Sequence, residues 1–173
     1  SKTVVIPLPD EGFDPTEVSV PWLQLTAHGV TVVFATPSGQ IGAADPRMLS
    51  GEGLGRHAER MRANAVAREA HAQMRQSPDF RNPRAYGALQ AADYDAVFYP
   101  GGHGPLWDLA EDAHSIALIE ATLNAGKPVA AVCHVPAVLR HPKGKDGQPV
   151  VKGKNVTGFT NTEEAAVGLT EVV

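Results

Sequence analysis

The sequence predicts an α/β fold with a doubly wound, mostly parallel sheet. Short apolar runs alternate with segments of helical spacing, and this alternation is typical of parallel β-α-β units with right-handed crossovers. Each run has the length and composition of a strand that is buried on both faces. The predicted strands are 3–8, 30–35, 96–99 and 129–132. Sites in such folds lie at the carboxyl ends of the strands, so the turns after these runs are the candidate site.

The helix between the first two strands has clear start and stop signals. Asp14 stands at the N-cap position, Pro15 at the first helical position and Glu17 three residues after the cap. Gly29 is expected to end the helix. Pro21, inside it, is expected to bend it or to loosen its first turns.

The middle of the chain is predicted to contain one long, polar helix over about 56–76. Its charges are typical of a solvated face, and its sparse apolar stripe indicates packing against the body of the protein or a partner subunit. Residues 40–50 and 77–92 are expected to be irregular. An amphipathic helix over 115–124 then leads into the strand at 129–132.

Beyond that strand, Pro136 is expected to begin a short helix. The Gly-, Lys- and Pro-rich stretch 141–155 suits a surface hairpin. Residues 156–159 are expected to form a last strand, and Thr160 or Thr162 to cap a final helix.

The bulk properties are those of one globular domain over residues 1–173. A net charge of −4 offers no basic surface for nucleic acid or acidic membranes. One cysteine excludes an internal disulfide and fits a reducing compartment. Because no signal peptide and no apolar run of about 20 residues is evident, the cytoplasm is the expected location.

No metal site is predicted from the histidines and the cysteine. His57, His71 and His141 lack the spacing of a metal-binding pair, and one cysteine cannot build a zinc cluster. These three histidines are expected at the surface.

Cys133 is the candidate nucleophile. It follows the predicted strand at 129–132 and precedes the helix that Pro136 begins, which resembles a nucleophile elbow although the familiar serine pattern is absent. The positive end of that helix would favour the thiolate and make Cys133 more reactive than an ordinary cysteine. A small apolar side chain in the core explains a single cysteine equally well.

The neighbours that a thiolate nucleophile needs are also candidates, each with a simpler alternative. His134 can act as the base only if the elbow is sharply bent, and is otherwise a bystander. Gly101 and Gly102 can form an oxyanion hole with the N–H of His134, or an ordinary glycine turn. Glu17 can shuttle protons if it faces the crevice, where burial would raise its pKa, or it can simply complete a capping box.

Two segments resemble the ThiJ/PfpI superfamily: Pro-Gly-Gly-His-Gly-Pro-Leu-Trp-Asp-Leu at 100–109, and Gly-Lys-Pro-Val-Ala-Ala-Val-Cys-His-Val-Pro-Ala-Val-Leu at 126–139. Residues 12–17, 34–39 and 156–164 also fit the branch named for the thirty-one-kilodalton heat-shock chaperone, which contains the glutathione-independent glyoxalases. The resemblance implies a flavodoxin-like three-layer α/β/α sandwich, usually homodimeric.

The resemblance also implies roles for individual residues. Cys133 would be the reactive cysteine, His134 the triad histidine and Glu17 a protonated glutamate beside the thiol. The residues implied to bind the oxyanion and the substrate are Gly101, Gly102 and His103.

The third triad member maps to the segment 161–164, where Glu164 is favoured over Glu163 and Asn161 comes last. Two features depart from the family pattern. Val135 stands where glycine is common and is expected to narrow the substrate pocket. Family members also continue for a further strand and helix, so the chain is expected to represent a single domain without them.

The implied activity is attack of Cys133 on the aldehyde of methylglyoxal or glyoxal, proton transfer by Glu17 or His134, and hydrolysis of the resulting thioester to lactate or glycolate. It needs no redox cofactor and no metal, and repair of glycated protein is a related activity. A Cys-His-acid triad suits amide or peptide hydrolysis equally well. A third hypothesis is a holdase chaperone or an oxidation sensor that uses Cys133.

Overall fold

The computed structural model of the protein describes residues 1–171. The strands are β1 (Thr3–Pro7), β2 (Glu11–Phe13), β3 (Thr31–Thr36), β4 (Ala43–Ala44), β5 (Arg84–Ala85), β6 (Ala96–Tyr99) and β7 (Val129–Ala131). The α-helices are α1 (Pro15–Ala27), α2 (Pro46–Ser50), α3 (Ala58–Met61), α4 (Ala65–Gln76), α5 (Pro78–Arg81), α6 (Gly104–Asp108), α7 (Ala113–Asn124) and α8 (Asn161–Val167). Four 3₁₀ turns complete the list: η1 (Gly55–His57), η2 (Tyr86–Ala88), η3 (Ala91–Asp93) and η4 (Val135–Leu139).

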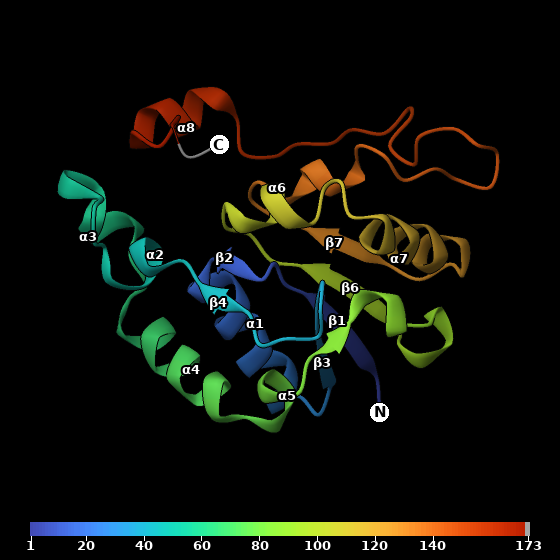
Figure 1. Cartoon of the computed structure of the whole chain (residues 1–173), viewed down its shortest axis with the longest axis horizontal. Helices are drawn as coiled ribbons and strands as arrows, with labels where there is room; N and C mark the ends of the chain where they lie inside the picture. Colours follow the sequence, from blue (N-terminus) through green and yellow to red (C-terminus); the bar gives the residue numbers. More distant parts are fainter. Residues whose placement is uncertain (172–173) are drawn as a thin grey trace.

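A five-stranded parallel sheet in the order β5-β3-β1-β6-β7 forms the centre of the fold (Figure 1). All four predicted strands lie in it, and the predicted α/β architecture is confirmed. β2 and β4 form a separate parallel pair, and an isolated bridge joins Phe13 to Gly102 after the end of β6. The carboxyl ends of β1, β6 and β7 therefore lie at one edge of the sheet.

Helices cover both faces of the sheet, and each face has its own apolar core. Val5 belongs to a cluster that includes Ile119 of α7, whereas its neighbour Ile6 belongs to one that includes Trp22 of α1. Successive residues of a strand point to opposite faces, so β1 contributes to both layers. None of the helices within residues 1–171 is long and apolar enough to span a membrane.

The predicted long helix over 56–76 is wrong, because two short helical segments, η1 and α3, precede α4. α3 ends before Arg62, whose backbone is extended. The side chain of Asn64 then caps α4 by accepting a hydrogen bond from the N–H of Ala67. Asparagine competes with the helical backbone for hydrogen bonds, so it favours a cap over a helix interior. The expectation that His71 is a surface residue is also wrong. α4 packs on α1, which leaves His71 only 6% exposed and against Phe13.

The predicted strand at 156–159 is also wrong. Instead of pairing with the sheet, this stretch passes over the elbow, where the N–H of Phe159 donates to the carbonyl of Cys133 over 2.8 Å. The hairpin expected over 141–155 closes with an isolated antiparallel bridge between Lys143 and Pro149. Thr160, not Thr162, caps α8.

Candidate active site

Cys133 lies in a sharp turn between β7 and η4. Its φ of +62° is the single positive value among the non-glycine residues that the structure describes. The left-handed region costs an L-residue about 1–2 kcal/mol, and such strain persists only where the surroundings hold it. The turn places the side chain of Cys133 above the carboxyl edge of the sheet, as the predicted elbow requires. The short helix expected to begin at Pro136 is present as a 3₁₀ helix of five residues that begins one residue earlier, at Val135.

Gly101 and Gly102 have no side chains, and this leaves room for the elbow. A methyl group on Gly101 would lie 2.1 Å from Glu17 Oε2 and 2.4 Å from Cys133 Cβ. Gly102 has a φ of +110°, and a methyl group there would lie 2.4 Å from the carbonyl oxygen of Gly12. Both positions therefore exclude any side chain, and the thiol and the carboxyl of Glu17 border the same space beside Gly101.

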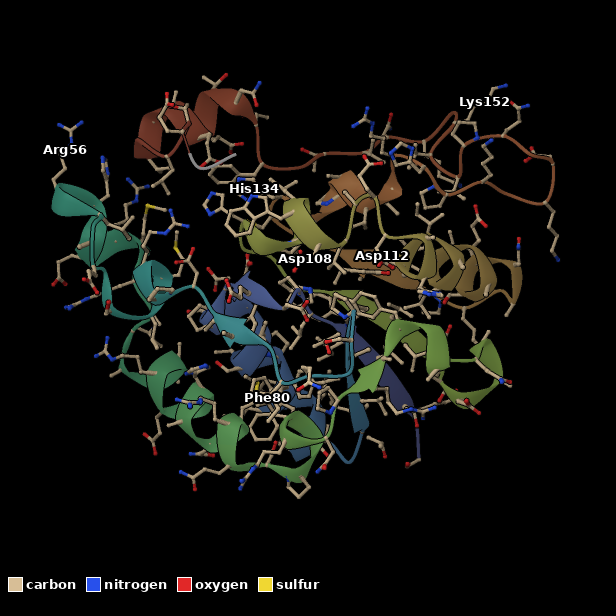
Figure 2. All side chains as sticks on the ribbon, in the orientation of Figure 1. Arg56, Phe80, Asp108, Asp112, His134 and Lys152 are labelled. Atoms are coloured by element: carbon tan, nitrogen blue, oxygen red, sulfur yellow. The ribbon has the colours of Figure 1, made fainter. Side chains whose placement is uncertain are left out.

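The bent elbow brings His134 against the thiol although the two residues are adjacent. His134 Nδ1 lies 3.2 Å from Cys133 Sγ, and His134 Nε2 is hydrogen-bonded to Glu164 Oε2. In Figure 2 the side chain of His134 lies beneath α8, which carries Glu164. The ring packs between those of His103 and Phe159, with centroid distances of 4.5 Å to each. This geometry is that of a Cys-His-acid triad, and the catalytic roles stay a prediction.

Of the three candidates on α8, Glu164 contacts His134. Glu163 is exposed and closes a capping box with Thr160, and Asn161 is exposed at the start of the helix. Glu164 is only 3% exposed. Burial raises its pKa, but hydrogen bonds from His134 and then His103 outweigh burial and hold the pKa below its usual value. Glu164 is therefore an ionised carboxylate.

Glu17 faces the elbow. Its Oε2 atom is buried and has no hydrogen-bond partner among the described residues. Burial, followed by the charge of Asp14, raises the pKa of Glu17 to about 7, while the backbone N–H of Gly101 offsets part of that rise. Near neutral pH this carboxyl thus exchanges a proton readily beside Cys133.

The expectation that a helix N-terminus lowers the pKa of Cys133 is wrong. Burial, followed by the charge of Glu17, raises it to about 11, although the backbone N–H groups of Gly102 and His134 offset part of the rise. A 3₁₀ turn of five residues has too few aligned peptides to compensate for burial. The resting group is a thiol, and it ionises more readily when Glu17 is protonated and His134 accepts its proton.

Replacing Glu17 by glutamine is expected to stabilise the protein above neutral pH. Because folding raises the pKa of Glu17 from 4.5 to about 7, the unfolded chain releases this proton first, and the folded protein loses stability as the pH rises through that interval. Above it the penalty is about 3 kcal/mol, and a glutamine side chain, which does not ionise, avoids this penalty. Urea unfolding of parent and Glu17→Gln at about pH 5 and pH 8 measures the effect. A variant with no advantage at the higher pH would contradict a buried, near-neutral carboxyl.

An apolar pocket of about 160 Å³ opens beside these groups. Its polar wall includes Cys133, His134 and Glu164. Its apolar wall consists of Met48, Met61, Phe159, Val167 and Leu169. Met48 and Met61 were not predicted as pocket residues, because the segment around α2 and α3 carries no motif.

The expectation that Val135 narrows the pocket is wrong. Its side chain is fully buried in the core cluster that includes Tyr99 and Ile119, on the α7 side of the sheet, and it is not one of the residues that line the pocket.

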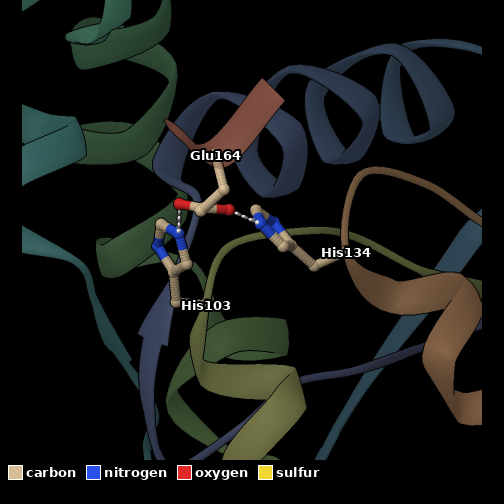
Figure 3. Close-up of side chains that lie close together, drawn as sticks. All are labelled: His103, His134 and Glu164. Carbon is tan, nitrogen blue, oxygen red and sulfur yellow. Dashed lines mark hydrogen bonds and ion pairs between the residues drawn. The ribbon is translucent and has the colours of Figure 1, made fainter. Parts of the chain in front are cut away.

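His103 was expected among the residues that bind the oxyanion or the substrate, and the structure places its ring against Glu164. His103 Nε2 lies 2.9 Å from Glu164 Oε1 (Figure 3). Within the described residues, His103, His134 and Glu164 are also a group that could hold a metal ion, with ligand atoms all within 4.8 Å of one another. Their mutual hydrogen bonds account for the arrangement without an ion.

Comparison with known proteins shows that most of the chain matches one protein family. A family described as ThiJ/PfpI family-like matches residues 8–151. Glyoxalase 3 of Candida albicans is 38% identical over 96 residues, which cover 54% of this chain and 40% of the relative. A glutathione-independent glyoxalase of Saccharomyces cerevisiae is 40% identical over 88 residues, which cover 49% of this chain and 36% of the relative.

Solved structures share the fold over the whole chain. The crystal structure of glyoxalase III from Candida albicans matches with a TM-score of 0.81 at 24% identity, covering 99% of this chain and 73% of that one. A ThiJ/PfpI domain protein from Brachyspira murdochii matches with a TM-score of 0.60 at 13% identity and covers 100% of this chain. At these identities the matches show the three-layer fold alone.

Proposed function

Because the chain belongs to the ThiJ/PfpI-like family, we propose that it is a cysteine-dependent glyoxalase that converts methylglyoxal to lactate, and glyoxal to glycolate, without glutathione. The observation that carries the proposal is the carboxyl of Glu17, with a pKa near neutrality, beside a thiol that is hydrogen-bonded to His134. Matches to curated relatives that bear the name glyoxalase support it.

The first step is addition of sulfur to the aldehyde carbon. His134 takes the proton of Cys133, and the thiolate forms a C–S bond while the carbonyl π electrons move to oxygen. The backbone N–H groups of Gly102 and His134, which lower the pKa of the thiol, would stabilise that oxyanion. Protonation of the oxyanion gives a hemithioacetal.

The second step moves hydrogen between the two substrate carbons. A base removes the proton from the former aldehyde carbon, and a proton is returned to the neighbouring carbon, so that the hemithioacetal becomes a thioester of the 2-hydroxy acid. Glu17 suits both transfers because its pKa is near neutrality. Water then cleaves the thioester and restores the thiol. The sum is addition of one water to the 2-oxoaldehyde, with no external oxidant or reductant.

We further propose that the protein works in the cytoplasm on a small 2-oxoaldehyde, without a nucleic-acid or membrane partner, and as a homodimer. A reducing compartment keeps the single nucleophilic cysteine in its thiol form. A pocket of about 160 Å³ has room for a ligand of only a few heavy atoms.

Lactate formation from methylglyoxal in glutathione-free buffer tests the proposal. We expect turnover by the parent, loss of turnover in Glu17→Gln, and parental turnover in Glu163→Gln, which keeps the capping box with Thr160. A parent protein that forms no lactate would contradict the proposal. Amide hydrolysis that is lost in Glu164→Gln and unaffected in Glu17→Gln would identify a hydrolase instead.

A further inference from the structure

We propose that His103 is a positioning residue that holds Glu164 in the orientation in which its second oxygen accepts from His134. The kinetic part of this inference rests on the proposed glyoxalase function, whereas the geometric part does not. The expected consequence is that His103, which also lines the pocket, controls the reactivity of Cys133 through Glu164 and His134.

The carboxylate of Glu164 is divided between two histidines that come from different turns. His103 follows β6 and Glu164 lies on α8, and each side chain is only 3% exposed. Because an ionised carboxylate only accepts hydrogen bonds, His103 Nε2 is the donor in the 2.9 Å contact with Oε1. The other oxygen, Oε2, is thereby turned toward His134 (Figure 3).

Apart from the two hydrogen bonds of Glu164, α8 is held over the site by apolar contacts. It reaches the site after a largely exposed stretch over 143–158, and its own apolar contacts come from Val167 together with Leu169, which pack with Met48 and Leu54. Apolar packing of this kind does not fix the rotation of a glutamate side chain. A second hydrogen bond, from His103, restricts that rotation. The ring of His103 is itself held by a tilted contact with the ring of His134, with 4.5 Å between the centroids.

Charged and titratable groups from several elements face His103. Its Nδ1 atom is buried without a hydrogen-bond partner among the described residues. The nearest carboxylate, Asp45 Oδ2, lies 4.0 Å away and is already paired with Arg47 at 2.6 Å. Asp14 acts on it from the start of α1, and His134 and Glu164 complete the set. The structure therefore gives His103 one hydrogen-bonded partner, Glu164.

Alkylation of Cys133 by iodoacetamide, followed as a function of pH, tests the proposal independently of turnover. The chain has one cysteine, so the reaction reports that thiol alone. We expect His103→Phe to slow alkylation at neutral pH about tenfold. Without the hydrogen bond from His103, the carboxylate of Glu164 can rotate, and it then stabilises the imidazolium of His134 beside the thiolate less well. The pH profile of the alkylation rate should move to higher pH in His103→Phe, and it should move in the same direction in Glu164→Gln.

A double-mutant cycle separates positioning from an independent role. If His103 acts only through Glu164, alkylation of the double variant, His103→Phe with Glu164→Gln, should be no slower than alkylation of the slower of the two single variants. His103→Gln, which restores an N–H donor, should recover most of the rate. His141→Phe is the matched control, because it removes an exposed hydrogen bond of the same 2.9 Å length, to Glu111, and should have no effect.

Additive effects of the two substitutions, or a parental alkylation profile in His103→Phe, would overturn the proposal. Thermal unfolding identifies a variant that does not fold. If His103→Phe does not fold, His103→Leu takes its place, because leucine also lacks an N–H donor and is smaller. Where the parent forms lactate, His103→Phe should lower kcat with KM little changed. A parent that forms no lactate contradicts the glyoxalase proposal and leaves the alkylation test intact.

Discussion

Replacing Cys133 by alanine is expected to lower lactate formation from methylglyoxal by roughly 10⁴-fold or more, because removal of a nucleophile leaves only the catalysis supplied by binding and the oxyanion hole. No second cysteine exists in the chain to take its place. The fold should survive, since alanine is smaller than cysteine and faces the same left-handed backbone conformation. Lactate assays and thermal unfolding of the same preparation measure both effects.

Cys133→Ser is the matched control for this prediction. It keeps the size of the side chain and a proton that His134 can accept, but a hydroxyl is a much weaker nucleophile toward an aldehyde than a thiolate. We expect it to be nearly as inactive as Cys133→Ala. Parental turnover in either variant would assign the addition step to another group. Suppression of aggregation that persists in Cys133→Ala would favour the chaperone hypothesis.

Gly101→Ala is expected to disable the site more severely than it destabilises the fold. The new methyl group would lie 2.1 Å from Glu17 Oε2 and 2.4 Å from Cys133 Cβ, which is closer than real Cβ atoms approach other heavy atoms. Its distance of 3.1 Å from Cys133 Sγ would also be tight. The φ of Gly101 is not in the left-handed region, so the cost comes from overlap alone. We expect a loss of at least about 100-fold in kcat/KM, since small displacements of reacting groups cost that much, and about 1–3 kcal/mol of stability.

Gly144→Ala is the control for the glycine substitution. Its methyl group would lie 3.1 Å from Asp146 Oδ1, the end of an exposed side chain that can move away. Lactate assays and urea unfolding of the two variants should therefore separate a site effect from a general cost of replacing glycine. Activity within a few-fold of the parent in Gly101→Ala would show that Glu17 and Cys133 need not share this space.

The strands were predictable because their sequence signal is local. A short run such as 30–35 is buried at Val32, Phe34 and Ala35 in the parallel sheet, and such burial favours apolar residues at successive positions. The elbow was predictable for a similar reason, since the strand at 129–132 stops at Cys133 and Pro136 cannot continue it. The mistaken elements lack such a signal. Residues 156–159 have the composition of a strand but lie over the elbow, where the structure pairs them with no strand.

The fold class, the position of Cys133 at the end of a strand and the short list of groups that meet it follow from the amino-acid sequence. The contact of His134 with Glu164 rather than Glu163, and the hydrogen bond of the His103 ring to the same carboxylate, became visible only in the folded structure. Folding also decided the pKa of Cys133, which burial raises although the turn had suggested the opposite. Elements follow from local patterns of apolar residues, whereas side-chain partners and pKa values depend on atoms that are distant in sequence and meet only when the sheet has formed.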